Sequence, residues 1–189
     1  MPVTGKLKIK ISVAYTKEFD LSTPKDPLSL ARQISIGSAV GADYPVDQVW
    51  HDRRTLADGA SETLDLTASL TDAFGDTVSF SNLKGMYIRN NSTEAYLRIG
   101  GAASNALTLL VTSDDLINLP PQGVMYFQFE RADGFIVSID DQLKITHDGS
   151  GSDSLTYDIV LVGHTTQPTP TPTATPTPSP SPTPTPTPT

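Results

Sequence analysis

The chain has 189 residues, a formal net charge of −8 and no cysteine. An acidic chain repels nucleic acid and anionic lipid, because phosphate binding needs clustered Lys and Arg. The lack of cysteine excludes disulfides, thiolate catalysis and Cys-based zinc sites. Without its Pro-rich C-terminal segment, the chain is long enough for one ordinary domain or two small ones.

The first predicted element is a strand near the N-terminus. Apolar side chains recur at every second position: Leu7, Ile9, Ile11, Val13 and Tyr15. This period of two is typical of a strand. Lys6, Lys8 and Lys10 occupy its other face, where lysines protect an edge strand from aggregation. We expect residues 1–45 to form an N-terminal strand and arm that can pair with another chain. A DNA contact through the lysines is the weaker alternative.

Residues 46–164 are predicted to form an all-β domain, because short apolar runs alternate with turn residues. The predicted strands of the chain after the first are 34–36, 64–66, 78–80, 86–89, 96–99, 107–111, 124–129, 135–139, 143–146 and 155–162. Residues 132–134 are predicted to form a hairpin turn. This spacing indicates an antiparallel β-sandwich or jelly-roll-like domain.

Three short segments do not read clearly as strands. Residues 27–33 and 113–119 are the best helix candidates, each with one or two turns. Residues 70–76 are predicted to form a helical turn or a loop that ends at Gly75. None of the three sustains a helical period, so the predicted class stays all-β.

Residues 165–189 are predicted to form a stiff, exposed stalk. Ten of the sixteen prolines lie there, alternating mostly with threonine. Alternating proline favours polyproline II and cannot join a hydrophobic core. Candidate O-glycosylation sites within it are Thr169, Thr171, Thr183 and Thr185. A disordered linker is the alternative interpretation.

The sequence predicts no catalytic, cofactor or metal site, and we expect the protein not to be an enzyme. His147, Asp148 and Ser150 crowd one short turn, whereas the members of a catalytic triad converge from separate elements. The oxygen-rich segment 148–153 resembles a calcium loop only weakly, and a hairpin turn explains it as well.

Two segments are candidates for interaction or modification. Trp50, the one tryptophan, is followed closely by Arg53 and Arg54. Trp and Arg dominate interface hot spots, so these three are interface candidates together with the N-terminal lysines. A buried ion pair and a solvated strand end are the alternatives. Asn90 and Asn91 begin two overlapping N-glycosylation patterns, although a turn would also explain them.

Five segments between residues 47 and 163 carry a family resemblance in consistent order: 49–56 (VWHDRRTL), 62–66 (ETLDL), 70–75 (LTDAFG), 100–106 (GGAASNA) and 155–163 (LTYDIVLVG). Together they resemble a family of small virion structural proteins encoded near the head genes of tailed bacteriophages. The resemblance implies a particle component without enzymatic residues. The Thr-Pro tail departs from the family pattern and favours a projecting appendage.

The leading hypothesis is a capsid decoration, cement or surface-fibre protein at the virion surface. It would bind the major capsid protein or neighbouring virion proteins as a dimer or trimer, with no cofactor, nucleic acid or membrane partner. The alternative is an extracellular glycosylated filament or surface-layer protein. A third hypothesis, a carbohydrate-binding module, would need an exposed aromatic platform, with Tyr87, Tyr96, Tyr126 and Phe127 as candidates.

Overall fold

The computed structural model describes residues 3–165, apart from 19, 24, 38–45, 109–111, 113, 130–133, 138 and 150–152. Within these residues the regular structure consists of strands, which confirms the predicted all-β class. The described residues include no helix that is long and apolar enough to cross a membrane.

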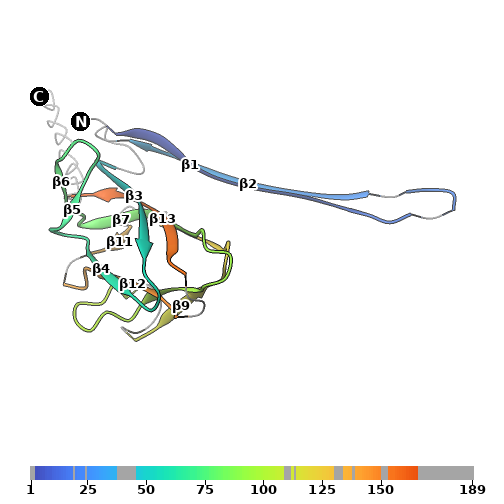
Figure 1. The fold of residues 1–189 in the computed structure, drawn as a ribbon. Coiled ribbons are helices and arrows are strands. Elements are labelled where there is room, and N and C mark those ends of the chain that lie inside the picture. The colour runs from blue at the N-terminus through green and yellow to red at the C-terminus, as the bar shows by residue number, and fades with distance from the viewer. Residues whose placement is uncertain are drawn as a thin grey trace, which may run out of the picture.

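Two antiparallel sheets form the body of the molecule, residues 46–165 (Figure 1). The larger sheet has the strand order β10 (Val124–Gln128), β7 (Asn82–Asn90), β13 (Leu155–His164) and β3 (Gln48–Leu56). The smaller sheet has the order β4 (Ser61–Asp65), β12 (Gln142–His147), β8 (Leu97–Gly100) and β9 (Leu116–Leu119). The short strands β5 (Leu70–Thr71) and β6 (Thr77–Val78) form a separate hairpin.

The pairing of the main strands is nested along the chain. β3 pairs with β13, β4 with β12, β7 with β10, and β8 with β9. The first of these strands in the chain therefore pairs with the last, the second with the last but one, and so on inwards to β8 and β9. The chain from β3 to β13 resembles one long hairpin folded over on itself, and this brings residues more than 100 positions apart into contact.

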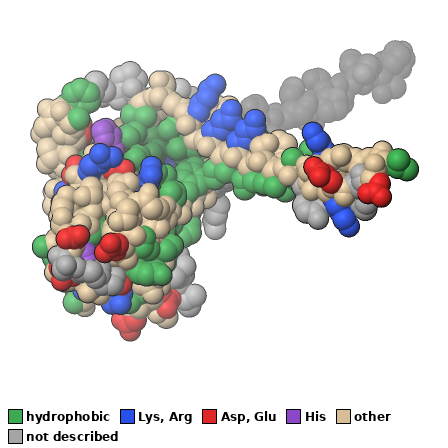
Figure 2. Space-filling view, turned by 45° about the vertical axis from the view of Figure 1, so that its right-hand side comes forward, with side chains coloured by type: hydrophobic (Ala, Val, Ile, Leu, Met, Phe, Trp, Pro, Cys, Tyr) green, Lys and Arg blue, Asp and Glu red, His purple; other side chains and the backbone are tan. Residues whose placement is uncertain are grey.

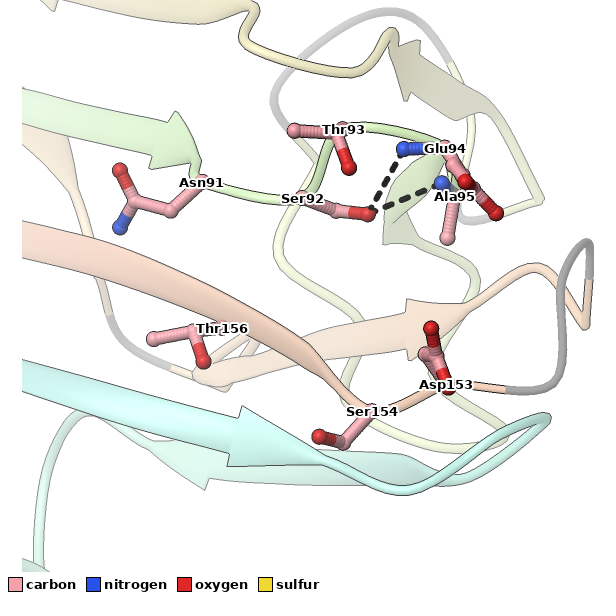
Figure 3. A pocket seen from close by; sticks show the side chains of 8 residues that line it. All are labelled: Asn91, Ser92, Thr93, Glu94, Ala95, Asp153, Ser154 and Thr156. Carbon is pink, nitrogen blue, oxygen red and sulfur yellow. Dashed lines mark hydrogen bonds between the residues drawn. The ribbon is translucent and has the colours of Figure 1, made fainter.

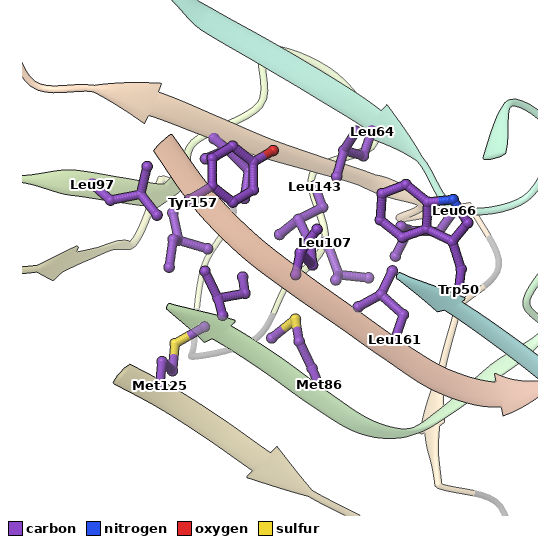
Figure 4. Packing of buried hydrophobic residues seen from close by; sticks show 14 of the residues in the cluster. Trp50, Leu64, Leu66, Met86, Leu97, Leu107, Met125, Leu143, Tyr157 and Leu161 are labelled. Carbon is purple, nitrogen blue, oxygen red and sulfur yellow. The ribbon is translucent and has the colours of Figure 1, made fainter. Parts of the chain in front are cut away.

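One hydrophobic core lies between the two sheets (Figure 4). Alternate residues of β13 point into it, and Leu155, Tyr157, Ile159 and Leu161 are all 0% exposed. Leu97, Leu143 and other residues of the smaller sheet complete the cluster from the opposite side. Alternating burial of this kind is typical of sheets that pack face to face, and the arrangement is consistent with a β-sandwich.

A long hairpin projects from this body (Figure 1). Its strands are β1 (Thr4–Thr16) and β2 (Lys25–Gly37), which pair along their whole length. We call this hairpin the arm. Of its described side chains only Ile34 is buried. Pro27 fits within β2 because each strand of a two-stranded ladder keeps a free edge, where a missing N–H breaks no bond.

Several predicted elements are confirmed, and others are wrong. The predicted strand at 7–15 lies within β1, and 143–146 and 155–162 lie within β12 and β13. Neither of the two helix candidates is a helix. Residues 27–33 belong to β2, and Leu116–Leu119 of the candidate 113–119 forms β9. Short apolar runs do not distinguish helix from strand by period, so long-range pairing decides.

Further differences from the sequence-based predictions concern strand placement. β3 was not predicted, because its sequence is polar and charged over most of its length. Of the hairpin turn predicted at 132–134, residues 132 and 133 lie outside the described part of the chain. The strands on either side of it, β10 and β11 (Phe135–Ile136), do not pair with each other; both pair with β7 and run in the same direction. Of the predicted strand 107–111, the described residues Leu107 and Thr108 are not in a strand. Residues 38–45 and 166–189 lie outside the described part of the chain.

Candidate interaction surface

The register of the arm sorts its side chains onto two faces, because residues directly opposite in an antiparallel ladder share a face. One face, the apolar arm face, carries Leu7, Ile9, Ile11, Val13, Asp26, Leu28, Leu30, Arg32 and Ile34. The other, the polar arm face, carries Lys6, Lys8, Lys10, Ser12, Ser29, Ala31, Gln33 and Ser35. Figure 2 shows the apolar strip along one side of the arm and the lysines on the other.

Beyond its root, where Ile34 is buried, the apolar arm face is uncovered in the single chain. Ile11 is 47% exposed, Val13 56%, Leu28 60% and Leu30 59%. An isolated two-stranded hairpin is at best marginally stable in water. Soluble monomers seldom expose contiguous apolar patches beyond a few hundred Å². The arm is therefore the clearest candidate for an interaction surface.

The root of the arm packs on the large sheet. A Cβ placed on Gly85 of β7 would lie 3.1 Å from Cδ1 of Leu7, so the absence of a side chain there makes room for Leu7. The N–H of Val46 donates to the carbonyl of Gly37 at 3.0 Å, which joins the end of β2 to the body. The apolar arm face consequently continues into the apolar surface of the body at this joint (Figure 2).

The six predicted interface residues are divided between exposed and internal positions. Lys6, Lys8 and Lys10 are exposed on the polar arm face. Trp50 is 2% exposed, and its Nε1–H donates to the carbonyl of Thr71 at 3.1 Å. The indole is therefore part of the core, and a partner cannot reach it while the domain is folded.

Arg54 belongs to a polar cluster that joins the two sheets. Its guanidinium lies 5.6 Å from the centroid of the Trp50 ring and donates to Oε2 of Glu62 at 2.6 Å. The hydroxyl of Tyr157 donates to the other oxygen of Glu62 at 2.9 Å. Burial, together with Glu62, raises the pKa of Tyr157, so this phenol remains a donor. Of the alternatives for Arg54, the structure favours the partly buried ion pair.

Arg53 lies on the outer face of the large sheet. Its guanidinium donates to Asp158 of β13 at 2.6 Å and 3.1 Å, and its side chain stays 71% exposed. This hydrogen bond holds the pKa of Asp158 below its usual range. Arg53 is thus accessible to a partner, whereas Arg54 and Trp50 are used inside the domain.

The two predicted N-glycosylation acceptors differ in burial. Asn90 is 0% exposed, and its amide donates to the carbonyls of Ala95, Leu119 and Pro120. A sugar on Asn90 would require these bonds to open, so the structure argues against modification there. Asn91 lies nearer the surface, where it lines a hollow of about 220 Å³ (Figure 3). The four candidate threonines of the tail lie outside the described residues.

Most residues that line the hollow are polar, and they come from the loop after β7 and from the start of β13 with the residues just before it. Residues 91–95 line one side, and Asp153, Ser154 and Thr156 line the other. Ser92 Oγ accepts from the N–H groups of Glu94 and Ala95 at 3.1 Å and 2.9 Å, as drawn in Figure 3. These bonds hold the loop in shape without a ligand.

The turn around His147 has a structural explanation. His147 is 1% exposed, and the N–H of Gly149 donates to its Nδ1 at 3.0 Å. Since Nδ1 accepts, Nε2 carries the proton and donates to the carbonyl of Asp153 at 3.0 Å. Both ring nitrogens are thus occupied by the loop, and Ser150 lies outside the described residues. Among the described residues no group of three or more His, Asp or Glu side chains could hold a metal ion.

The aromatic candidates do not form one platform. Tyr87 and Tyr126 face each other across β7 and β10, and both are half-buried. Phe127, the next residue along β10, points to the opposite face and lies 6.2 Å from Phe129 between ring centroids. Tyr96 is 43% exposed and precedes β8 in the other sheet.

The strands predicted from the sequence did not include Leu28 and Leu30 of the apolar arm face. Both lie in the helix candidate 27–33, although Leu28, Leu30, Ile34 and Ile36 all occupy even-numbered positions, as the alternation of a strand requires. That alternation was the available signal. Comparison with known proteins adds no relative to this picture: no family model matches the chain, and no curated protein does.

Proposed function

We propose that this protein is a virion structural protein of a tailed bacteriophage, a capsid decoration, cement or surface-fibre protein that binds the assembled shell as a symmetric oligomer. The observation that carries the proposal is the arm with its uncovered apolar face. With 13 residues in each strand, it reaches about 40 Å from the body. An extended apolar arm of this kind suits a protein whose partner is a neighbouring subunit.

The strand order of the body supports a jelly-roll architecture. Its nested pairs distribute β3, β13, β7 and β10 to one sheet and β4, β12, β8 and β9 to the other. Double-sheet jelly rolls occur in viral capsid and lectin domains. Because one fold serves many functions, this likeness supports the proposal only by analogy, and the arm remains the main argument.

Charge is distributed unequally between the two regions. Residues 3–37 contain six Lys or Arg and three Asp or Glu, whereas residues 38–165 contain seven and eighteen, which gives net charges of +3 and −11. An acidic body suits an outer surface rather than one that faces packaged DNA. The Thr-Pro segment, as a polyproline II stalk, would project outward from it.

The mechanism would be linkage to the assembled lattice. A protein that binds the assembled shell but not its free subunits stabilises the shell by mass action. A symmetric oligomer repeats one weak contact several times, so avidity supplies the strength that a single contact lacks. No catalytic chemistry is needed for this role.

The test is the copy number of the protein in purified virions, measured by quantitative mass spectrometry against the major capsid protein. Hundreds of copies per particle are expected for a shell decoration. A handful would move the protein to the neck or tail, and its absence would overturn the proposal.

The second candidate is an extracellular glycosylated filament or surface-layer protein. The arm favours it in one respect: an arm that docks on the next copy without a closing symmetry generates an open filament. The intact mass of the native protein separates the candidates, since a glycosylated protein would exceed the 20.2 kDa of the sequence by many hexose units.

A further inference from the structure

We propose that the apolar arm face is covered by the same face of a second copy of this chain, with the two arms antiparallel and related by a two-fold axis. This identifies the contact that makes the oligomer in the proposed function. The dimer itself would form in solution and does not depend on the shell.

The apolar arm face matches a second copy of itself in chemistry and shape. The middle of the apolar arm face is aliphatic, with Ile11 opposite Leu30 and Val13 opposite Leu28. The outer face of the large sheet is a poorer match, because it carries the Arg53–Asp158 ion pair. Two ribbons of equal length and twist can pack face to face at about 10 Å, as sheets do in a sandwich.

Charged residues flank the aliphatic centre of the apolar arm face in a definite order. Its two charged residues are Arg32, opposite Ile9, and Asp26, opposite Tyr15. Two aliphatic cross-strand pairs, or rungs of the ladder, lie between them: Ile11–Leu30 and Val13–Leu28. The pattern along β2 is therefore negative, aliphatic, aliphatic, positive.

This pattern is complementary to its own reverse. A two-fold axis across the arm between the two aliphatic rungs places Arg32 of each copy over Asp26 of the other. It also places the rung of Ile11 over the rung of Val13. Opposite charges then meet at both ends of an aliphatic centre, which fixes one register and disfavours a shifted or parallel arrangement.

The lysines of the arm lie outside the proposed contact. Lys6, Lys8 and Lys10 lie on the polar arm face and point away from the proposed contact. Two arms can thus approach without bringing these like charges together. An arrangement with the polar faces inward would place six lysines in one interface, which repulsion disfavours.

The size of the contact predicts its strength. The face from residue 7 to residue 15 covers about 30 Å by 10 Å, or about 300 Å² in each copy. A stable interface typically buries about 800 Å² in each partner. The arm dimer should therefore dissociate on dilution, and a shell that holds copies close together would favour it through effective concentration.

The first experiment is sedimentation of the full chain over a range of concentrations. We expect a monomer–dimer equilibrium. Ile11→Asp and Leu30→Asp should weaken it by about tenfold or more, since each buries a charge in the aliphatic centre. Ser12→Asp and Ser29→Asp are matched controls, because they form the neighbouring rung on the polar arm face and should leave the dissociation constant unchanged. Circular dichroism and Trp50 fluorescence check that each variant is folded.

The second experiment tests the register by charge exchange. Arg32→Glu and Asp26→Lys should each weaken the dimer, and the double variant should recover it, because each copy again presents opposite charges at the two ends. Failure of the double variant to recover would overturn the antiparallel register. A wild-type chain that stays monomeric at millimolar concentration, or that forms a trimer, would overturn the two-fold dimer.

These results are independent of the proposed function. A monomer found at hundreds of copies per virion would overturn the arm dimer and leave the decoration role intact. If the protein forms the dimer with the predicted charge rescue but is absent from virions, the arm dimer stands and the decoration role is overturned.

Discussion

The arm and the body are both built from antiparallel strands with alternating apolar residues, yet they differ in what those residues contact. Leu161 of β13 is 0% exposed, whereas Leu30 of β2 is 59% exposed. The body has two sheets that cover each other, and the arm has one ribbon with nothing on its apolar face. Backbone pairing alone can specify a hairpin, but a second layer is needed to make it stable.

The largest difference should appear in hydrogen exchange at low protein concentration. Amides of β13 should open only with global unfolding, whereas those of β1 and β2 should exchange faster by orders of magnitude, because few buried contacts hold them closed. Mass spectrometry of peptides from both regions measures this. Equal protection of the arm in dilute protein would show that it does not need a partner.

The second prediction compares one substitution in the two regions. Leu161→Ala should lower the free energy of unfolding by about 2–5 kcal/mol, because it leaves a cavity in the core. Leu30→Ala should change it by no more than about 0.5 kcal/mol in dilute protein, as for other exposed positions. Urea unfolding followed by Trp50 fluorescence reports both. Similar losses for the two variants would contradict the division into body and arm.

The third prediction concerns polar groups of the body. Glu62→Ala should lower the free energy of unfolding by about 1–3 kcal/mol, because Arg54 and Tyr157 each lose a charged hydrogen-bond partner in a partly buried cluster. Arg53→Ala is the control. It removes a solvent-exposed ion pair on the same strand as Arg54 and should change the free energy of unfolding little. A larger loss for Arg53→Ala would reverse the assignment of these two arginines.

The smallest effect is the pH dependence of the body. Arg53 lowers the pKa of Asp158, and the N–H of Thr67 lowers that of Asp65. A carboxyl with a lowered folded-state pKa stabilises the fold above its unfolded pKa, about 4 for Asp. This contribution is lost as the pH falls through the folded value.

Acid titration of the unfolding free energy should therefore show a decline below about pH 4. The decline should be shallower in Asp158→Asn and Asp65→Asn. The same slope in wild type and both variants would show that other groups control acid stability.

The sequence by itself determined the features that depend on local pattern. The period of two in residues 7–15 predicted both the strand β1 and the separation of lysines from aliphatic side chains. Regularly spaced turn residues predicted an all-β protein. The lack of cysteine excluded disulfides without reference to any structure.

Tertiary structure alone decided the features that depend on distant partners. Residues 27–33 became a strand because β1 pairs with them, and the charged segment Gln48–Leu56 became one because β13 does. Neighbouring residues Arg53 and Arg54 point to opposite faces, so one meets Asp158, 105 positions away, and the other meets Glu62. Local sequence cannot encode these partners, because a strand acquires its contacts only when another strand lies beside it.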